Sequence, residues 1–197
     1  MRWGLILIAP KYILRVTINH YFIMKKKTVK LNNFMEGLHN AIITSPQFRK
    51  NTTGKSEVQI QTEIRPLILQ YLECHFREEG YLDYVGKANK SFYWEGQEGK
   101  YGKDRAATFG ARNYPDFIIT APYLIAVEYK QSQNGSTVKQ GIGQSLMHTM
   151  TEDFHYVYYL FHDESKEKKI EESTLRSKEK SILEKLWSNF NLYIKVV

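Results

Sequence analysis

The segment from Tyr114 to Lys130 constrains the fold of this chain more than any other stretch. Residues 117–120 form a short apolar, β-branched run, Ala121-Pro122 interrupts it, and residues 123–129 form a second such run. Two runs of this kind separated by a tight turn are typical of a β-hairpin. We therefore expect two neighbouring strands here, and the other elements can be arranged around them.

Three ionisable side chains stand at defined positions on this hairpin. Asp116 begins the first strand, while Glu128 and Lys130 lie two residues apart near the end of the second. The pleat of a strand points residues two apart to the same face, so antiparallel pairing would bring Asp116 and Glu128 together with Lys130 beside them. Two buried carboxylates repel each other unless a cation neutralises them. The pattern therefore indicates a Mg²⁺ site, at which a lysine could hold or activate a metal-bound water.

Pro115-Asp116 followed by Glu128-Tyr129-Lys130 resembles the core motif of the PD-(D/E)XK, or restriction-endonuclease-like, nuclease superfamily. The resemblance implies an α/β fold with an αβββαβ core, in which helices flank a mixed central sheet. It also implies a Mg²⁺-dependent endonuclease, with Mn²⁺ able to substitute, in which Asp116 and Glu128 bind the metal and Lys130 orients the nucleophilic water. On the hairpin alone, a solvated strand end with an ordinary cross-strand ion pair is an open alternative.

A long helix before the hairpin is expected to supply a further acid. Ser56 is suited to cap a helix over residues 57–79, which Gly80 would end. At helical spacing Glu57 points with the apolar stripe, whereas Glu63 falls on its flank. The resemblance assigns the third metal-site acid to Glu57, with Glu63 as the substitute, and the open alternative is an acid favoured by the helix dipole. The stripe comprises Ile60, Ile64, Leu67, Ile68, Tyr71 and Leu72, and Pro66 predicts a late start, a break or a kink.

Residues 137–150 predict a second helix after the hairpin. One face carries Val138, Ile142, Leu146 and Met150, and a polar row carries Gln140, Gln144 and His148. In the superfamily this helix often has a glutamine followed four residues later by a tyrosine. Gln144 matches that pattern in part, with His148 in place of the tyrosine, which implies that Gln144 binds a phosphate or orients Lys130. A plain polar helix face is the alternative.

The other segments complete an order of helix, strands, hairpin, helix, strand, helix and strand. We expect a helix over residues 33–43 and an irregular segment over 81–113 that contains the strand Phe92-Tyr93-Trp94. We then expect a strand over 155–161, a mixed-charge run over 165–180 that is an exposed loop or a helix start, a helix over 182–190 and a strand over 192–197. Residues 1–55 are assigned to an N-terminal arm or to added strands, at 4–8 and 12–18, with a helix, and residues 56–197 are assigned to the nuclease domain. The apolar residues 1–24 are interrupted too often to span a membrane.

The net charge indicates the kind of binding partner, and the cysteine content indicates the cellular compartment. The net charge of +7 favours a polyanion, and double-stranded DNA is the leading candidate. The basic residues Lys87, Lys90, Lys100, Lys103, Arg105 and Arg112 either contact phosphates or belong to a solvated loop. The single cysteine, Cys74, excludes an internal disulfide and a cysteine zinc site, and a cytoplasmic setting is expected.

Several functions fit these expectations. Type II restriction endonucleases look most similar, either as a symmetric homodimer or as the small cleavage subunit of a heterodimeric type IIS enzyme with a larger recognition subunit. A nuclease for DNA repair or for structured DNA is a further possibility. From a different class, the chain could be a catalytically inactive nucleic-acid-binding or partner-binding protein with the same fold. The sequence has no Walker phosphate loop and no dinucleotide-binding fingerprint.

Overall fold

The computed structural model describes residues 29–46, 48, 54–95, 97, 114–150 and 154–197. The chain divides into two units, Met1–Glu36 and Gly37–Val197, and the fold given below is that of the second. Residues 29–43 are helical, in line with the helix expected over 33–43. The strands or arm expected within the first 24 residues lie outside the described residues. So do Lys100, Lys103, Arg105 and Arg112, for which phosphate contact and a solvated loop were the alternatives.

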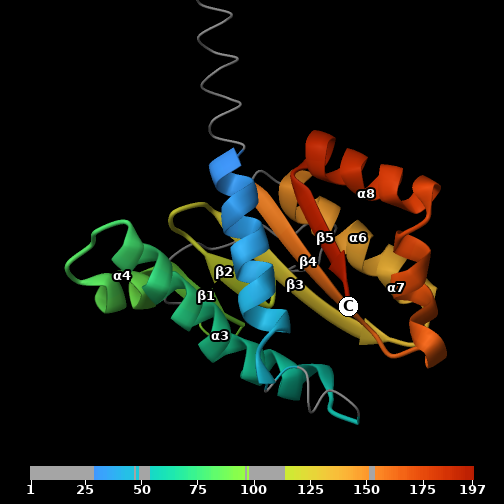
Figure 1. Cartoon of the computed structure of the whole chain (residues 1–197), viewed down its shortest axis with the longest axis horizontal. Coiled ribbons are helices and arrows are strands. Elements are labelled where there is room, and N and C mark those ends of the chain that lie inside the picture. The colour runs from blue at the N-terminus through green and yellow to red at the C-terminus, as the bar shows by residue number, and fades with distance from the viewer. Residues whose placement is uncertain (1–28, 47, 49–53, 96, 98–113, 151–153) are drawn as a thin grey trace, which may run out of the picture. The chain divides into compact units, whose positions relative to one another are not determined.

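Within the described residues, five strands form one mixed sheet in the order β1-β2-β3-β4-β5 (Figure 1). They are β1 Phe92–Trp94, β2 Phe117–Ile119, β3 Ile125–Ser132, β4 Tyr156–Asp163 and β5 Leu192–Val196. The first three strands pair antiparallel, and β3, β4 and β5 pair parallel. The expected class, an α/β fold with a mixed sheet flanked by helices, is confirmed at this level.

The expected hairpin is formed by β2 and β3. Phe117 lies opposite Val127 and Ile119 lies opposite Ile125, so one further step along the same register brings Asp116 opposite Glu128. Residues directly opposite each other in an antiparallel pair point to the same face of the sheet. The register therefore fixes the two carboxylates as cross-strand neighbours.

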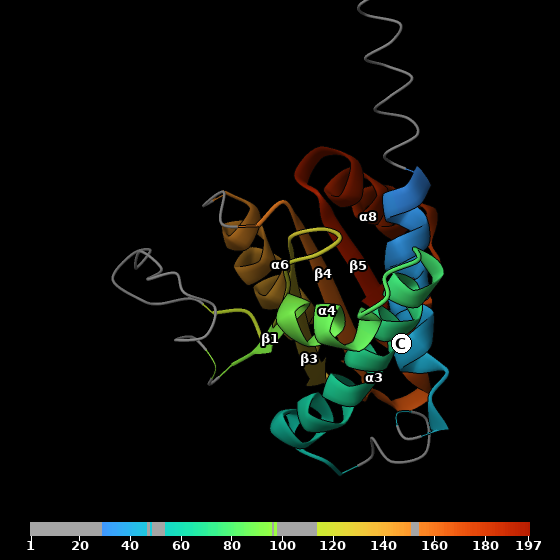
Figure 2. The same ribbon diagram turned by 90° about the vertical axis from the view of Figure 1, so that its left-hand side faces the viewer.

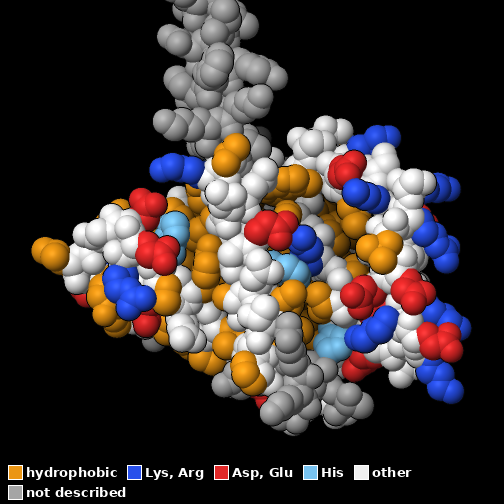
Figure 3. Space-filling model, viewed as in Figure 1, with side chains coloured by type: hydrophobic (Ala, Val, Ile, Leu, Met, Phe, Trp, Pro, Cys, Tyr) orange, Lys and Arg blue, Asp and Glu red, His pale blue; other side chains and the backbone are white. Residues whose placement is uncertain are grey.

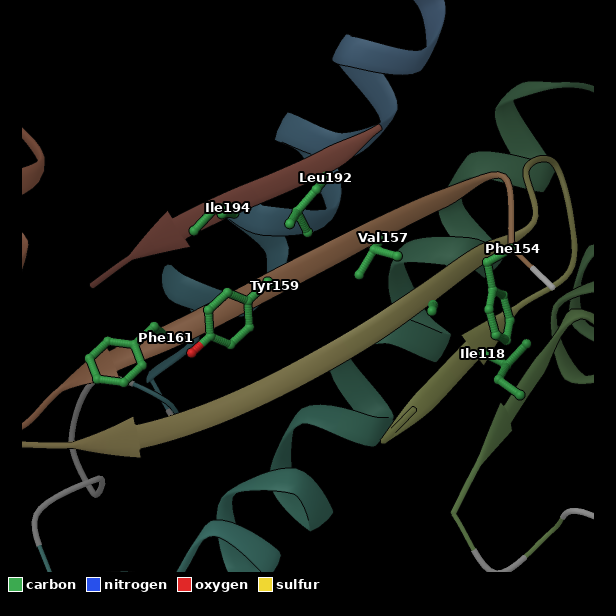
Figure 4. Close-up of a cluster of buried hydrophobic side chains, with 8 residues drawn as sticks. Ile118, Phe154, Val157, Tyr159, Phe161, Leu192 and Ile194 are labelled. Carbon is green, nitrogen blue, oxygen red and sulfur yellow. The ribbon is translucent and has the colours of Figure 1, made fainter. Parts of the chain in front are cut away.

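One face of the sheet is covered by α6 Gly135–Met150, α7 Lys169–Thr174 and α8 Ser177–Phe190. Alternate residues of β4 and β5 lie together on one face of the sheet (Figure 4), and this layer packs against them; among them are Val157, Tyr159, Phe161, Leu192 and Ile194. The predicted apolar face of α6 packs here through Val138, Ile142 and Leu146. Met150, which was expected on the same face, is 65% exposed because it is the last residue of the helix.

The other long helix, α3 Glu57–Glu78, begins and ends as the sequence predicts. Ser56 forms a capping box with Gln59, and Gly80 follows the helix with a φ of 84°. Its buried stripe is Ile60, Gln61, Ile64, Ile68, Leu72 and Phe76. The helix neither starts late nor breaks at Pro66, whose side chain is exposed. Figure 2 shows α3 and α6 on opposite sides of the sheet.

The segment expected to be irregular before β1 contains a helix instead, α4 Tyr84–Ser91. Asp83 caps it by accepting a hydrogen bond from the Gly86 amide at 2.9 Å. A Cβ on residue 86 would lie 2.2 Å from the Asp83 carboxylate, so glycine makes room for this cap. Gly86 therefore belongs to the start of this helix. The strand Phe92–Trp94 is confirmed as β1.

The mixed-charge run after β4, expected as an exposed loop or a helix start, is largely helical. It comprises a 3₁₀ turn, η1 Lys166–Lys168, then α7 and the first turn of α8. Acidic and basic side chains intermingle over this layer (Figure 3), and α7 and α8 contain no fully buried residue. Over the described residues, no helix combines the length and the hydropathy needed to cross a membrane.

Candidate functional site

The centre of the candidate site is the carboxylate pair at the end of the hairpin. Asp116 is 8% exposed and Glu128 is 4% exposed. The Asp116 Oδ2 atom accepts a hydrogen bond of 2.7 Å from the backbone amide of Tyr129. This bond ties the start of β2 to β3 and holds the Asp116 side chain beside Glu128.

The environment of Asp116 disfavours its charged form. Burial, and after it the negative charge of Glu128, raise the pKa of Asp116 to about 8, with a further contribution from Glu57. The Tyr129 amide and the charge of Lys130 act in the opposite direction without balancing these effects. A buried acid that faces a second acid is the arrangement that a bound cation would relieve.

Lys130 is joined to Glu57 at the N-terminal end of α3. The Lys130 Nζ atom donates a hydrogen bond of 2.6 Å to Glu57 Oε1. Burial alone would lower the pKa of Lys130, but the bond to Glu57 and the charges of Asp116 and Glu128 outweigh it, and the net shift is upward. Lys130 is therefore a fixed cation at neutral pH, and it can donate hydrogen bonds but cannot accept a proton.

The two candidate acids of α3 have separate partners. Glu57 pairs with Lys130, whereas Glu63 pairs with Lys55. The two carboxylate side chains are similarly exposed, at 32% and 31%. Of the two, Glu57 is the one that the structure brings to the hairpin.

The start of α3 is held against the end of β3 by a further contact. The Gln131 side-chain amide donates a hydrogen bond of 2.6 Å to the backbone carbonyl of Lys55. Its own carbonyl accepts a hydrogen bond of 3.1 Å from the Tyr129 hydroxyl. Since Lys55 lies two residues before Glu57, this contact fixes the distance between Glu57 and Lys130.

His148, which the sequence assigned only to a polar helix row, reaches the carboxylate pair from α6. Its Nε2 atom lies 2.6 Å from Glu128 Oε1, and both side chains are buried. Gln144, the residue expected to act from this helix, is exposed, and its side chain makes no hydrogen bond with the described residues. The signal available in the sequence was the histidine at the position where the family pattern has tyrosine.

The donor set suits a hard cation in part. Asp116 and Glu128 offer oxygen ligands, and Mg²⁺ commonly uses one or two carboxylates together with waters and a substrate phosphate. Glu57 is engaged by Lys130, and no group of three or more His, Cys, Asp or Glu side chains in the described part of the chain is arranged to hold a metal. Among the described residues, the two hairpin carboxylates are thus the oxygen donors that a hard cation could use.

Comparisons with protein-family models, with curated proteins and with solved structures each gave no significant match.

Proposed function

We propose that this chain is a Mg²⁺-dependent DNA endonuclease of the PD-(D/E)XK type. The observation that carries the proposal is the cross-strand pair of Asp116 and Glu128, buried at one end of the hairpin with Lys130 beside it. An ordinary cross-strand ion pair would join opposite charges, but here two acids face each other and Lys130 pairs with a third acid on another element. An arrangement of this kind favours a cation site.

The order of elements supports the same proposal. A long helix precedes three antiparallel strands, and α6 then crosses to a parallel strand, β4. This order agrees with the αβββαβ core of the superfamily. The acids and the lysine fall on the elements where that core has its motif, namely the first helix, the start of β2 and the end of β3.

Each residue has a distinct role in the proposed reaction. Asp116 and Glu128 hold the cation, which, when bound, supplies an activated water and offsets the charge that develops on the scissile phosphate. Lys130, kept protonated by Glu57, donates a hydrogen bond that orients the nucleophilic water or a phosphate oxygen. Glu57 acts through Lys130 or through water. Gln144 is exposed on α6, from where it can contact a DNA backbone phosphate.

A type II or type IIS restriction endonuclease is the form of nuclease that we propose. The net charge of +7 favours DNA as the substrate. One site per chain cuts one strand at a time, so cleavage of a duplex calls for a second chain. That chain is either a second copy or a larger recognition subunit.

The first test is cleavage of supercoiled plasmid by purified protein with Mg²⁺ or Mn²⁺, against EDTA. Asp116→Ala should reduce nicking by at least about 10²-fold, because one of two metal ligands is lost. Circular dichroism of the variant checks that the fold is intact. Cleavage that persists in the variant would contradict the proposal.

A second measurement separates a nuclease from a binding protein. If the wild-type chain binds DNA tightly but leaves it uncut with either metal, alone and with a second subunit added, a non-catalytic nucleic-acid-binding function is favoured instead. Preference for branched over linear DNA would indicate a repair nuclease.

A further inference from the structure

We infer that His148 is a positioning residue that fixes the Glu128 carboxylate in the proposed metal site. The inference rests on the proposed function and adds a residue to it. It starts from the contact of 2.6 Å between His148 Nε2 and Glu128 Oε1, made where the two side chains are 3% and 6% exposed.

The contact determines where the other oxygen of Glu128 lies. Among the described residues, the hydrogen bond to the Glu128 carboxylate comes from His148. A glutamate side chain has three rotatable bonds, so an unheld carboxylate samples several directions. With Oε1 bound, Oε2 stays free of hydrogen bonds from the described residues and is available beside Asp116, which lies opposite on the neighbouring strand.

His148 is itself held by its surroundings. Its ring packs edge-on against Phe154, with centroids 5.7 Å apart and an interplanar angle of 88°. The helix that carries His148 lies close to the sheet. A Cβ added at Gly141 would be only 2.1 Å from the Tyr159 hydroxyl oxygen, which shows how near α6 and β4 are at this point. Tyr159 is the register neighbour of Glu128 on β4. The imidazole thus approaches Glu128 from a packed helix, as residues that orient metal ligands commonly do.

A buried histidine can also contribute to stability without any role in a site, and His39 is a matched control for this possibility. His39 Nδ1 lies 2.8 Å from the Tyr158 hydroxyl, and His39 is 7% exposed. Tyr158 and Glu128 point to opposite faces of the sheet, since Tyr159 is the neighbour that shares the face of Glu128. His39 therefore controls for the loss of a buried histidine contact away from the carboxylate pair.

The test compares two substitutions of His148 whose side chains differ in length. Glutamine at 148 extends an amide about as far as Nε2, whereas asparagine is one methylene shorter and cannot contact Glu128. We expect His148→Asn to weaken Mn²⁺ binding to the DNA-free protein by about 10–100-fold in titration calorimetry. His148→Gln should recover most of this affinity, and His39→Asn should leave it unchanged. Thermal unfolding of each variant reports the fraction folded.

A metal-free readout accompanies the titration. In ¹³C NMR at one fixed pH, the Glu128 side-chain carboxyl resonance, assigned by its loss in Glu128→Gln, should move in His148→Asn and stay in place in His39→Asn. Equal Mn²⁺ affinities for His148→Asn and wild type would overturn the role of His148 while leaving the nuclease intact. Absence of both Mn²⁺ binding and cleavage in the wild type would overturn the proposed function, and this inference with it.

Discussion

Asp116 shows how a single residue couples the candidate site to stability. Its pKa in the folded protein is raised from 3.8 to about 8, so between these values the folded state holds a proton that the unfolded chain releases. The contribution of Asp116 to stability is therefore fully present below about pH 4 and is lost as the pH rises through about 8. At alkaline pH the metal-free site opposes folding.

We expect Asp116→Asn to stabilise the metal-free protein at alkaline pH. Removing the charge that faces Glu128 should raise the free energy of unfolding at pH 8.5 by roughly 1–3 kcal/mol, with little effect near pH 4. Urea unfolding in EDTA at the two pH values measures this. A variant less stable than the wild type at pH 8.5 would argue against a repulsive carboxylate pair.

Asp163 provides the contrasting control. It accepts hydrogen bonds of 2.8 to 2.9 Å from the backbone amides of Ser165, Ile170 and Glu171. Burial alone would raise its pKa, but these bonds and one with the Ser165 side chain outweigh it and lower the pKa. Asp163→Asn should therefore destabilise the protein in the same experiment, opposite in sign to Asp116→Asn.

The two glutamates of α3 give a paired prediction on activity. Glu57→Gln weakens the ion pair that holds Lys130, so the rate of Mg²⁺-dependent nicking should fall by about 10–100-fold. Glu63→Gln removes a similarly exposed carboxylate whose partner is Lys55, and the rate should stay within a few-fold of wild type. Initial rates at saturating DNA measure both. Equal losses would mean that the two ion pairs serve the fold of α3 alone.

At the level of elements, the packing of α6 against the sheet depends on one glycine. Gly141 faces the Tyr159 hydroxyl at a distance that excludes a side chain, whereas a Cβ added to Gly143 would meet nothing within 4 Å. Both are interior positions of the same helix. The pair therefore separates a packing requirement from helix propensity.

We expect Gly141→Ala to destabilise the protein by about 1–3 kcal/mol, because the added methyl group forces α6 or Tyr159 to move. Gly143→Ala should instead stabilise it by about 0.5–1 kcal/mol, because alanine favours the helix and the space is open. Chemical unfolding measures both values. Since α6 also carries His148, Gly141→Ala should lower nicking, and normal activity with normal stability would refute the close approach.

Over the whole molecule, the sequence predicted best what local patterns determine. The hairpin, the cap of α3, the apolar face of α6 and the final strands each follow from a period or a turn within one segment. The polar row of α6 was a different case, because periodicity shows that residues share a face and not which of them lies against the sheet. His148 is buried at Glu128 while Gln144 is exposed, and tertiary packing decides between them.

The helix α4 was missed for a related reason. It is only eight residues long and contains glycine, lysine and asparagine, and its buried residues are Ala88 and Ser91. Its start depends on the hydrogen bond that the Asp83 side chain accepts, and helix propensities of single residues do not include this contact. Helical spacing already favoured Glu57 over Glu63, but the lysine partner of each acid follows only from the tertiary structure.

The mixed sheet also sets an order in which the site can assemble during folding. Asp116 and Glu128 are 12 residues apart on an antiparallel hairpin, which closes a short loop, whereas Lys130 and Glu57 are separated by 73 residues. His148 joins only when the crossover helix docks with the parallel strands. Because short loops close at lower entropic cost, we expect the repelling acids to meet early and their stabilising partners to arrive late. A cation present during refolding would then offset the repulsion between these acids before their partners dock, and we expect it to speed folding as well as to stabilise the folded protein.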